Sequence, residues 1–222
     1  MLTILSSGYT RTCQTVSRRE FFRIGLDKGA WRGRVPTAAG GKDAYQVIEY
    51  FPELKAFVYE CNWGKDLRLW DMEKKEERRL GSFPFGIHGV MEYNPVHKVM
   101  LFGAGDNGDG QAKGNPNLYL MTSDGKVTKL KPPPIHINCT PTSKLMCDPV
   151  SGEYIVKGVG DNKVYAFHPL RDEWKEIPGL RLHEGEALGV SIDTYGVVML
   201  LARKDGRDFR CYLYKHQPLW RE

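Results

Sequence analysis

The chain contains 222 residues, of which 41% are hydrophobic and 27% are charged, a balance that is ordinary for a soluble globular protein and argues against disorder. The formal net charge of +5 is small and basic residues are mixed with acidic ones, so nucleic acid is not an expected partner. No apolar run approaches the roughly 20 residues that a membrane-spanning helix needs, so we expect no membrane span.

The first predicted unit, residues 1–37, contains three strands. Short apolar or alternating stretches at 2–6, 20–24 and 31–35 have the length and composition of β-strands. They correspond to the second, third and fourth strands of the units that follow, and no stretch fits the first strand. We therefore expect this unit to be incomplete.

Two complete units are predicted next, at residues 44–81 and 88–131. Each begins with a strand that is closed by a proline turn, at 47–52 and at 90–95. Later strands of the two units are predicted at 56–59, 67–70, 98–103 and 117–120. Both units therefore have the same order of short strands and tight turns.

The clearest unit spans residues 142–178. Its four strands are predicted at 145–149, 153–158, 163–168 and 174–177. The last unit, residues 186–222, has strands at 189–193, 197–201 and 210–213. Its fourth strand, around Trp220, is cut short, so we expect the last unit to be incomplete as well.

A nearly constant spacing relates these units. The equivalent third-strand positions are Ile24, Trp70, Leu120, Phe167 and Leu213, which lie 46, 50, 47 and 46 residues apart. A tryptophan stands seven residues after three of these positions, at Trp31, Trp174 and Trp220. A spacing near 46 with four short strands per unit is typical of the blades of a β-propeller.

Several residues make the chain resemble one family of propellers, the kelch family. They are the Asn94-Pro95 and Asp148-Pro149 turns, the glycines that end the second strands, Tyr119, Tyr165 and Tyr212 in third strands, and the three fourth-strand tryptophans. The resemblance covers nearly the whole chain, but the glycine doublet of kelch repeats is not kept, so the chain resembles a divergent member. It implies an all-β fold in which residues 1–222 form a single domain of about five four-stranded antiparallel blades.

The incomplete first and last blades leave two alternatives open. The chain is either a section of a six- or seven-bladed ring, which we favour, or a set of five repeats that closes on itself. An open set of blades exposes apolar faces and strand edges, which predicts self-association.

The five cysteines, Cys13, Cys61, Cys139, Cys147 and Cys211, are irregularly spaced and include no Cys-x-x-Cys pair. This pattern favours buried free thiols in a reducing compartment over a disulfide framework. The apolar stretch after Met1 is too short for the core of a signal peptide. We therefore expect a cytoplasmic protein.

Binding sites on propellers usually lie on one face, formed by the loops between blades and those between second and third strands. The candidate binding residues in these loops are His88, Asp106, Asn107, His136, Asp161, His183, Glu184, Glu186 and Arg203. Each of the histidines has an alternative role as a loop residue that is hydrogen-bonded to the backbone. No histidine spacing supports a metal site, and we expect no cofactor.

The sequence favours a non-catalytic module that holds a protein or peptide partner, with a carbohydrate as a second candidate ligand. No nucleophile elbow, Walker loop, dinucleotide fingerprint or zinc-protease motif is present. The alternative is a carbohydrate-active or metal-dependent enzyme. In that case His88, His136, His183 and Glu186 would meet at the central channel.

Overall fold

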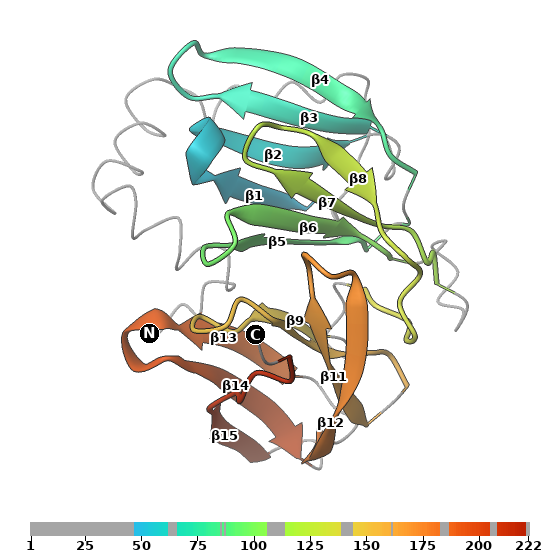
Figure 1. The fold of residues 1–222 in the computed structure, drawn as a ribbon, viewed down its shortest axis with the longest axis vertical. Helices are drawn as coiled ribbons and strands as arrows, with labels where there is room; N and C mark the ends of the chain where they lie inside the picture. The colour runs from blue at the N-terminus through green and yellow to red at the C-terminus, as the bar shows by residue number, and fades with distance from the viewer. Residues whose placement is uncertain are drawn as a thin grey trace.

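Alternation of apolar and polar residues produces short strands, and the described part of the computed structural model has fifteen of them in four antiparallel sheets (Figure 1). The structure describes residues 47–61, 66–84, 86, 88–105, 114–138, 144–160, 162–182, 187–204 and 208–220. The predicted first blade, residues 1–37, lies outside these ranges.

The first three sheets have four strands each, in chain order. The first consists of β1 (Ile48–Phe51), β2 (Ala56–Cys61), β3 (Asp66–Asp71) and β4 (Glu76–Ser82). The second consists of β5 (Val90–Asn94), β6 (Val99–Gly103), β7 (Leu118–Thr122) and β8 (Val127–Lys129). The third consists of β9 (Lys144–Cys147), β10 (Tyr154–Lys157), β11 (Lys163–His168) and β12 (Glu173–Arg181).

The fourth sheet has three strands in the described residues. They are β13 (Ala187–Ile192), β14 (Val197–Lys204) and β15 (Asp208–Tyr214). Two short 3-10 helices occupy first turns, η1 (Pro52–Leu54) between β1 and β2 and η2 (Asp193–Tyr195) between β13 and β14. Within the described residues the last blade is therefore incomplete, as expected.

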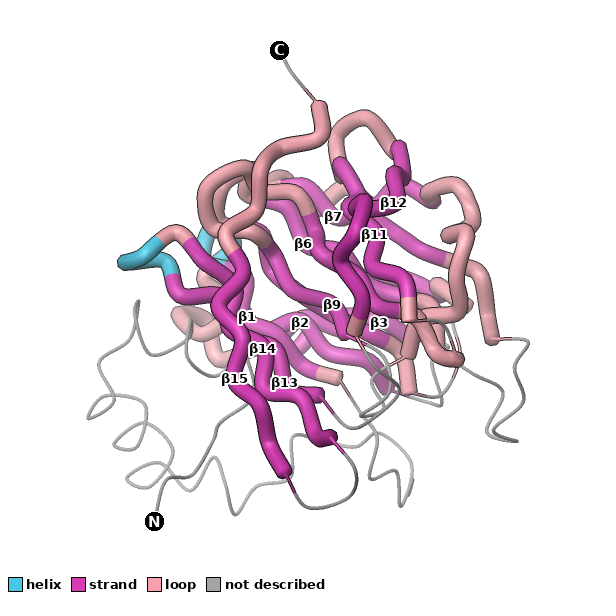
Figure 2. Tube along the Cα trace, turned by 90° about the horizontal axis from the view of Figure 1, so that it is seen from below, coloured by secondary structure: helices cyan, strands magenta, loops and turns pink. Residues whose placement is uncertain are grey.

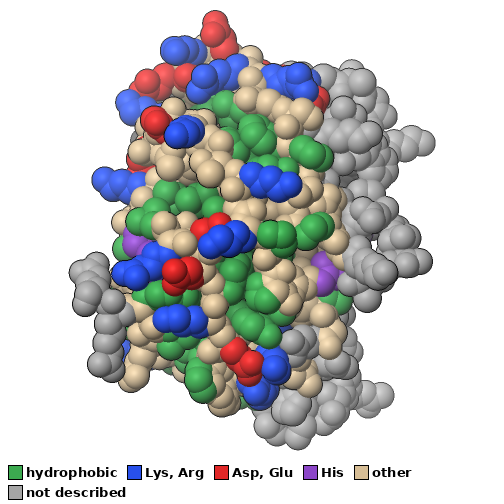
Figure 3. All heavy atoms as spheres, turned by 45° about the vertical axis from the view of Figure 1, so that its right-hand side comes forward, with side chains coloured by type: hydrophobic (Ala, Val, Ile, Leu, Met, Phe, Trp, Pro, Cys, Tyr) green, Lys and Arg blue, Asp and Glu red, His purple; other side chains and the backbone are tan. Residues whose placement is uncertain are grey.

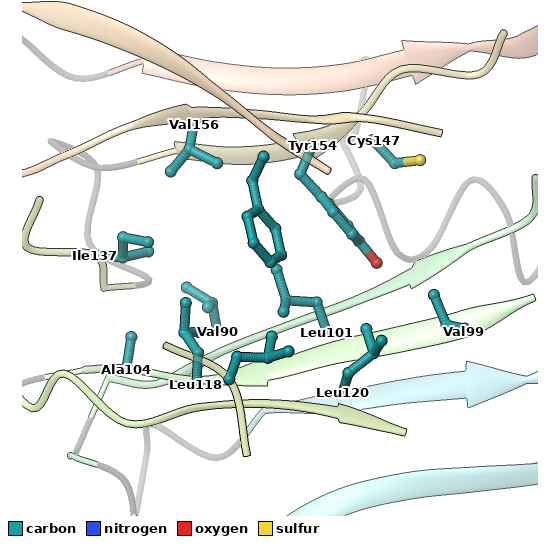
Figure 4. Packing of buried hydrophobic residues seen from close by; sticks show 12 residues of the cluster. Val90, Val99, Leu101, Ala104, Leu118, Leu120, Ile137, Cys147, Tyr154 and Val156 are labelled. Atoms are coloured by element: carbon teal, nitrogen blue, oxygen red, sulfur yellow. The ribbon is translucent and has the colours of Figure 1, made fainter. Parts of the chain in front are cut away.

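Apolar side chains from neighbouring sheets meet in three cores. One core joins the first and second sheets, another the second and third, and the last the third and fourth. Figure 4 shows the middle core, where Leu101 and Leu118 lie opposite Tyr154 and Val156. Full burial of a side chain of this size stabilises the fold by about 1.5–3 kcal/mol.

The first strands of the sheets lie next to one another: β5 contacts both β1 and β9, and β9 also contacts β13. Four-stranded meanders that pack face to face around such a row of first strands are the blades of a β-propeller. The predicted all-β propeller fold is therefore confirmed.

The sheets have two ends that carry different connections. We call the end with the β1–β2, β5–β6, β9–β10 and β13–β14 turns the turn face. Figure 2 shows η1 and η2, in cyan, on the same side of the molecule. The opposite end, with the connections between sheets and the long β6–β7 connection, is the loop face, where the sequence places the binding residues.

Two of the predicted fourth-strand tryptophans have different environments. Trp174 lies in β12, and its ring stacks on that of Phe167 with the centroids 4.5 Å apart. Trp220 lies outside any strand and packs, almost fully buried, against the third sheet. Residues 215–220, which we call the tail, thus cross to the neighbouring blade instead of returning along β15.

The surface agrees with the charge pattern of the sequence. In Figure 3 basic and acidic side chains are intermixed, most densely in the upper part of the view. Strand β4 alone carries Glu76, Glu77, Arg78 and Arg79 in succession. Within the described ranges, no helix has the length and hydrophobicity that crossing a bilayer requires.

Candidate functional site

The turns of the turn face are fixed by side chains that bond to their own backbone. The Asn94 side-chain oxygen accepts hydrogen bonds from the amides of Val96 at 3.1 Å and His97 at 3.0 Å. Its Nδ2 donates to the carbonyl of Gly152 in the next sheet at 2.7 Å. One buried amide therefore both closes its own turn and binds it to the neighbouring turn.

Asp148 has the same role one blade later. Its Oδ2 accepts from the amides of Val150 at 3.2 Å and Ser151 at 2.7 Å, and from the Ser151 hydroxyl at 2.8 Å. Gly152 follows with φ +73°, a conformation that favours glycine. The turn backbone is thus satisfied internally, which leaves the side chains at its tip to face outward.

An apolar residue stands at the tip of three successive turns. Val96, Val150 and Tyr195 are 39%, 61% and 75% exposed, and we call them together the apolar ridge. A Cβ atom built on Gly152 would lie 2.9 Å from Val96, and one built on Gly196 would lie 2.9 Å from Val150. These close approaches show that each turn lies against the next, so the three exposed side chains stand on adjoining turns of three sheets.

Two stacked histidines lie beside the ridge. The ring centroids of His97 and His168 are 5.6 Å apart, with the rings 30° from parallel, and the centroids of His168 and Trp220 are 5.5 Å apart, with these rings nearly perpendicular. Burial lowers the pKa of both histidines, and the neighbouring His97 lowers the pKa of His168 further. Among the described residues, the buried atoms His97 Nε2 and His168 Nδ1 have no hydrogen-bond partner.

A buried polar chain joins the tail to the third sheet. His216 Nε2 donates to Glu153 Oε2 at 2.7 Å, and His216 Nδ1 lies 2.9 Å from the Tyr214 hydroxyl. The Leu219 amide donates to Glu153 Oε1 at 3.2 Å. Burial raises the pKa of Tyr214, and the carboxylates of Asp148 and Glu153 raise it further.

The end of the tail is held by a second set of contacts. The indole N–H of Trp220 donates to Glu173 at 2.7 Å, while Lys175 Nζ donates to the Leu219 carbonyl at 2.9 Å. The same Lys175 ammonium lies 4.4 Å from the centre of the Trp220 ring, a cation–π contact. The tail is therefore docked by polar and apolar contacts together.

These polar groups are engaged in holding the fold. Glu153 and His216 are buried and bonded to each other, so they present no free group to a ligand in solvent. Across the described ranges, no three His, Cys, Asp or Glu side chains are arranged to hold a metal ion. What the turn face offers a ligand is its apolar ridge.

On the loop face, the structure places the predicted binding residue His136 at the base of the loops. Its Nε2–H donates to the Gly105 carbonyl at 3.1 Å, and its own carbonyl accepts from the Val159 amide at 2.8 Å. A Cβ atom on Gly114 would lie 2.0 Å from the His136 ring, so only glycine fits there. His136 thus joins connections from the second and third sheets.

The other predicted residues are distributed as follows. His88 is half-buried in the β4–β5 connection, with a left-handed backbone at φ +58°. Arg203 lies in strand β14 and not in the loop where the sequence placed it, because β14 extends to Lys204. The remaining residues lie outside the described ranges: Asp106, Asn107, Asp161, His183, Glu184 and Glu186. The predicted meeting of His88, His136, His183 and Glu186 at a channel stays a prediction.

The apolar ridge was missed by sequence reasoning, although a signal for it exists. Each of its residues stands two positions after an Asn or Asp at the end of a first strand or directly after one, at Asn94, Asp148 and Asp193. From the sequence, the turns at Asn94 and Asp148 indicated only how the repeats align with one another. Their tips point to the face opposite the one expected to bind.

Comparisons with solved structures identify similar folds. An auxiliary nutrient binding protein from Bacteroides ovatus aligns with a TM-score of 0.53 and 10% identity, covering 81% of this chain and 44% of that one. TolB from Acinetobacter baumannii gives a TM-score of 0.51 and 17% identity, covering 77% and 41%. An auxiliary nutrient binding protein from Bacteroides thetaiotaomicron gives 0.50 and 13%, covering 75% and 40%.

The chain thus spans less than half the length of each of these structures. No protein-family model matches the sequence, and no curated protein sequence matches it. At identities this low the structural likeness is informative about the fold alone. Together with the four packed sheets, it identifies the chain as a β-propeller-like protein.

Proposed function

We propose that the protein is a binding module that holds a protein or peptide partner on its turn face. The observation that carries this proposal is the apolar ridge, in which Val96, Val150 and Tyr195 are exposed at the tips of three adjoining turns. Exposed apolar side chains that gather on one face of a protein are characteristic of interaction sites.

The turns restrict the kind of partner. The Val96, His97, Val150 and Ser151 amides are already bonded to Asn94 or Asp148, so they offer no donors to a β-strand of a ligand. Recognition would instead come from side-chain contacts, with the aromatic Tyr195 as the largest exposed group. A partner that presents Leu, Met or aromatic side chains fits this surface.

We also propose that the chain is a divergent kelch-like propeller and that residues 1–222 form one domain. Two features support this family assignment: the turns at Asn94-Pro95 and Asp148-Pro149, and the stacking of Trp174 on Phe167.

The thiols of Cys147 and Cys211 are free, which supports a reducing, cytoplasmic location. The loop-face residues predicted from sequence form a second candidate surface for the same kind of partner.

Selection of peptides from a displayed random library against the 222-residue chain tests the proposal. Peptides rich in apolar residues should bind, and the double variant V150E/Y195E should weaken their Kd at least about tenfold, equivalent to about 1.4 kcal/mol. Ile48, also exposed but in strand β1, provides the matched control I48E, which should bind as the parent does.

Other outcomes would contradict the proposal. If H88A abolishes binding while V150E/Y195E does not, the partner occupies the loop face and the turn-face assignment is wrong. If no peptide binds but an oligosaccharide on a glycan array does, the protein or peptide ligand class is wrong.

A further inference from the structure

Four carboxylates lie in or beside the β9–β10 and β11–β12 turns, and each accepts a hydrogen bond from another group of the chain. They are Asp148, Glu153, Asp172 and Glu173. Their donors are, in the same order, the Ser151 amide, the His216 ring, the Lys131 amide and the Trp220 indole, at 2.7, 2.7, 2.9 and 2.7 Å. These carboxylates are therefore already used in holding the turns and the tail together.

The adjoining segments carry three exposed basic side chains that, among the described residues, have neither an ion pair nor a hydrogen bond. They are Lys98 in the β5–β6 turn, Arg171 in the β11–β12 turn and Lys215 in the tail, and we call them the basic rim. Long basic side chains keep their charged ends in water when the protein offers them no partner. The basic rim is therefore available to an anionic group of a ligand.

The stacked histidines connect two members of the basic rim to the apolar ridge. His97 stands between Val96 and Lys98, so Lys98 shares a tight turn with an exposed apolar residue of the ridge. Burial lowers the pKa of His168, and the charges of His97 and Arg171 lower it further, which places Arg171 within electrostatic range of the stack. Lys98 and Arg171 therefore both lie near the Val96 end of the ridge.

The two ends of the apolar ridge differ in charge. Lys215 belongs to the tail, which is bonded through its next residue to the turn that carries Val150. At the far end of the ridge, Asp193 is exposed and stands two residues before Tyr195. An anionic group of a ligand is therefore favoured near Val96 and Val150 and disfavoured near Tyr195.

We infer that the partner of the apolar ridge is an acidic peptide segment, whose carboxylates bind the basic rim while its apolar side chains contact the ridge. This inference rests on the proposed function, because the apolar contacts hold the partner and the charges select and orient it. Interfaces commonly have an apolar centre and a polar rim, whose charges set specificity and the rate of association. A nucleic acid fits less well, because so few cations beside apolar side chains offer few phosphate contacts.

Three peptides with one apolar core, taken from the library selection described above, test this inference on the full chain. They differ only in a pair of residues at one end of the core, which is Glu-Glu, Gln-Gln or Lys-Lys. The parent chain should bind the Glu peptide at least about fivefold more tightly than the Gln peptide, and the Lys peptide most weakly. This preference should decrease between about 50 and 500 mM NaCl, because salt screens exposed charges.

The double variant K98E/R171E should reverse the preference and bind the Lys peptide more tightly than the Glu peptide. It should bind the Gln peptide as the parent chain does, which also shows that the variant is folded. The matched control K75E/K129E changes the net charge equally, but its exposed lysines lie just before β4 and at the end of β8, the outermost strands of their sheets. It should bind all three peptides as the parent chain does.

Equal affinity of the parent chain for the Glu and Gln peptides would overturn this inference and leave the proposed function in place. Failure of all three peptides to bind would overturn both. A K98E/R171E variant that still prefers the Glu peptide would overturn the inference, as would a thymidine oligonucleotide that binds more tightly than this peptide. If the double variant loses the Gln peptide as well, the parent chain decides: a preference that salt does not change overturns the inference.

Discussion

The imidazole of His216 donates a hydrogen bond of 2.7 Å to the carboxylate of Glu153, which is 63 residues away in the sequence. Both side chains are almost completely buried. The pair connects the tail to the β9–β10 turn, which carries Val150 of the apolar ridge. It therefore stabilises the position of the tail and the junction of the third and fourth sheets.

Removal of the Glu153 carboxylate should destabilise the protein strongly. E153A leaves His216 Nε2 and the Leu219 amide buried without an acceptor, at a cost of about 3 kcal/mol in the free energy of unfolding. E153Q keeps an acceptor oxygen and should lose less. Urea unfolding followed by circular dichroism measures both variants, and an E153A loss below about 1 kcal/mol would show that the pair is energetically unimportant.

Acidification should weaken the fold through the stacked histidines. Because burial lowers the pKa values of His97 and His168 in the folded state, the unfolded chain binds more protons once the pH falls below the ordinary histidine pKa, about 6.5. The free energy of unfolding therefore keeps its full value above that pH. It decreases as the pH falls through the pKa values that the two histidines have in the folded state.

H168F keeps a ring against His97 and Trp220 but cannot be protonated, so it should flatten the fall in melting temperature between about pH 7 and 5, the range in which histidine titrates. Thermal melts across this range compare the two chains. An identical pH dependence for H168F and the parent would exclude a contribution from this histidine.

Replacement of Gly103, the last residue of β6, by any residue with a side chain should destabilise the protein. Its φ is +124°, and a Cβ atom would lie 2.3 Å from the backbone oxygen of Asn117. Gly125 has φ +81° with nothing within 4 Å, so G125A isolates the cost of the backbone conformation. We expect G125A to lose about 1 kcal/mol and G103A more than about 2 kcal/mol in urea unfolding. Equal losses would mean that the loop relaxes around the added atom.

The positions of the strands could be predicted from the sequence because alternation and turn residues are local signals. The strand expected at 163–168, for example, is β11, and the turns after Asn94 and before Gly152 are where the proline pairs indicated. The exact register between repeats could not be predicted. Leu120 and Phe167 were aligned as equivalent, yet they lie in one core and meet from opposite sheets.

This difference has a simple geometric cause. A shift of one residue between repeats turns a side chain to the opposite face of its sheet, while the spacing between repeats hardly changes. The correct equivalent of Leu213 is Ala166, which faces the next sheet as Leu213 does. Which face of the fourth sheet Leu213 occupies is therefore visible only after the register is known.

The candidate site was less predictable than the fold. Glu153 of the β9–β10 turn bonds to His216 of the tail and interacts electrostatically with His97 of the β5–β6 turn, and no spacing along the chain encodes these approaches. The role of Trp220 was also hidden, because its seven-residue step from Leu213 matched the fourth-strand pattern. Its contacts with Glu173 and Lys175 show that tertiary packing of the tail prevailed over the repeat pattern.

Asn94 should be the most sensitive residue of the turn face, because its side chain serves two turns. N94A removes the acceptor for the Val96 and His97 amides and the donor to Gly152, which should lower the free energy of unfolding by about 2 kcal/mol.

N94D keeps the acceptor, as Asp148 does in the next turn, but it loses the donor and sets a carboxylate against the Gly152 carbonyl. N94D should therefore also be destabilised at pH 7 and should partly recover in acid, where the protonated carboxyl can donate. Urea unfolding at pH 7 and at about pH 5 tests this, since burial raises a carboxyl pKa into that range. If N94D is as stable as the parent at pH 7, the bond between the turns contributes nothing, and the ridge is held by packing alone.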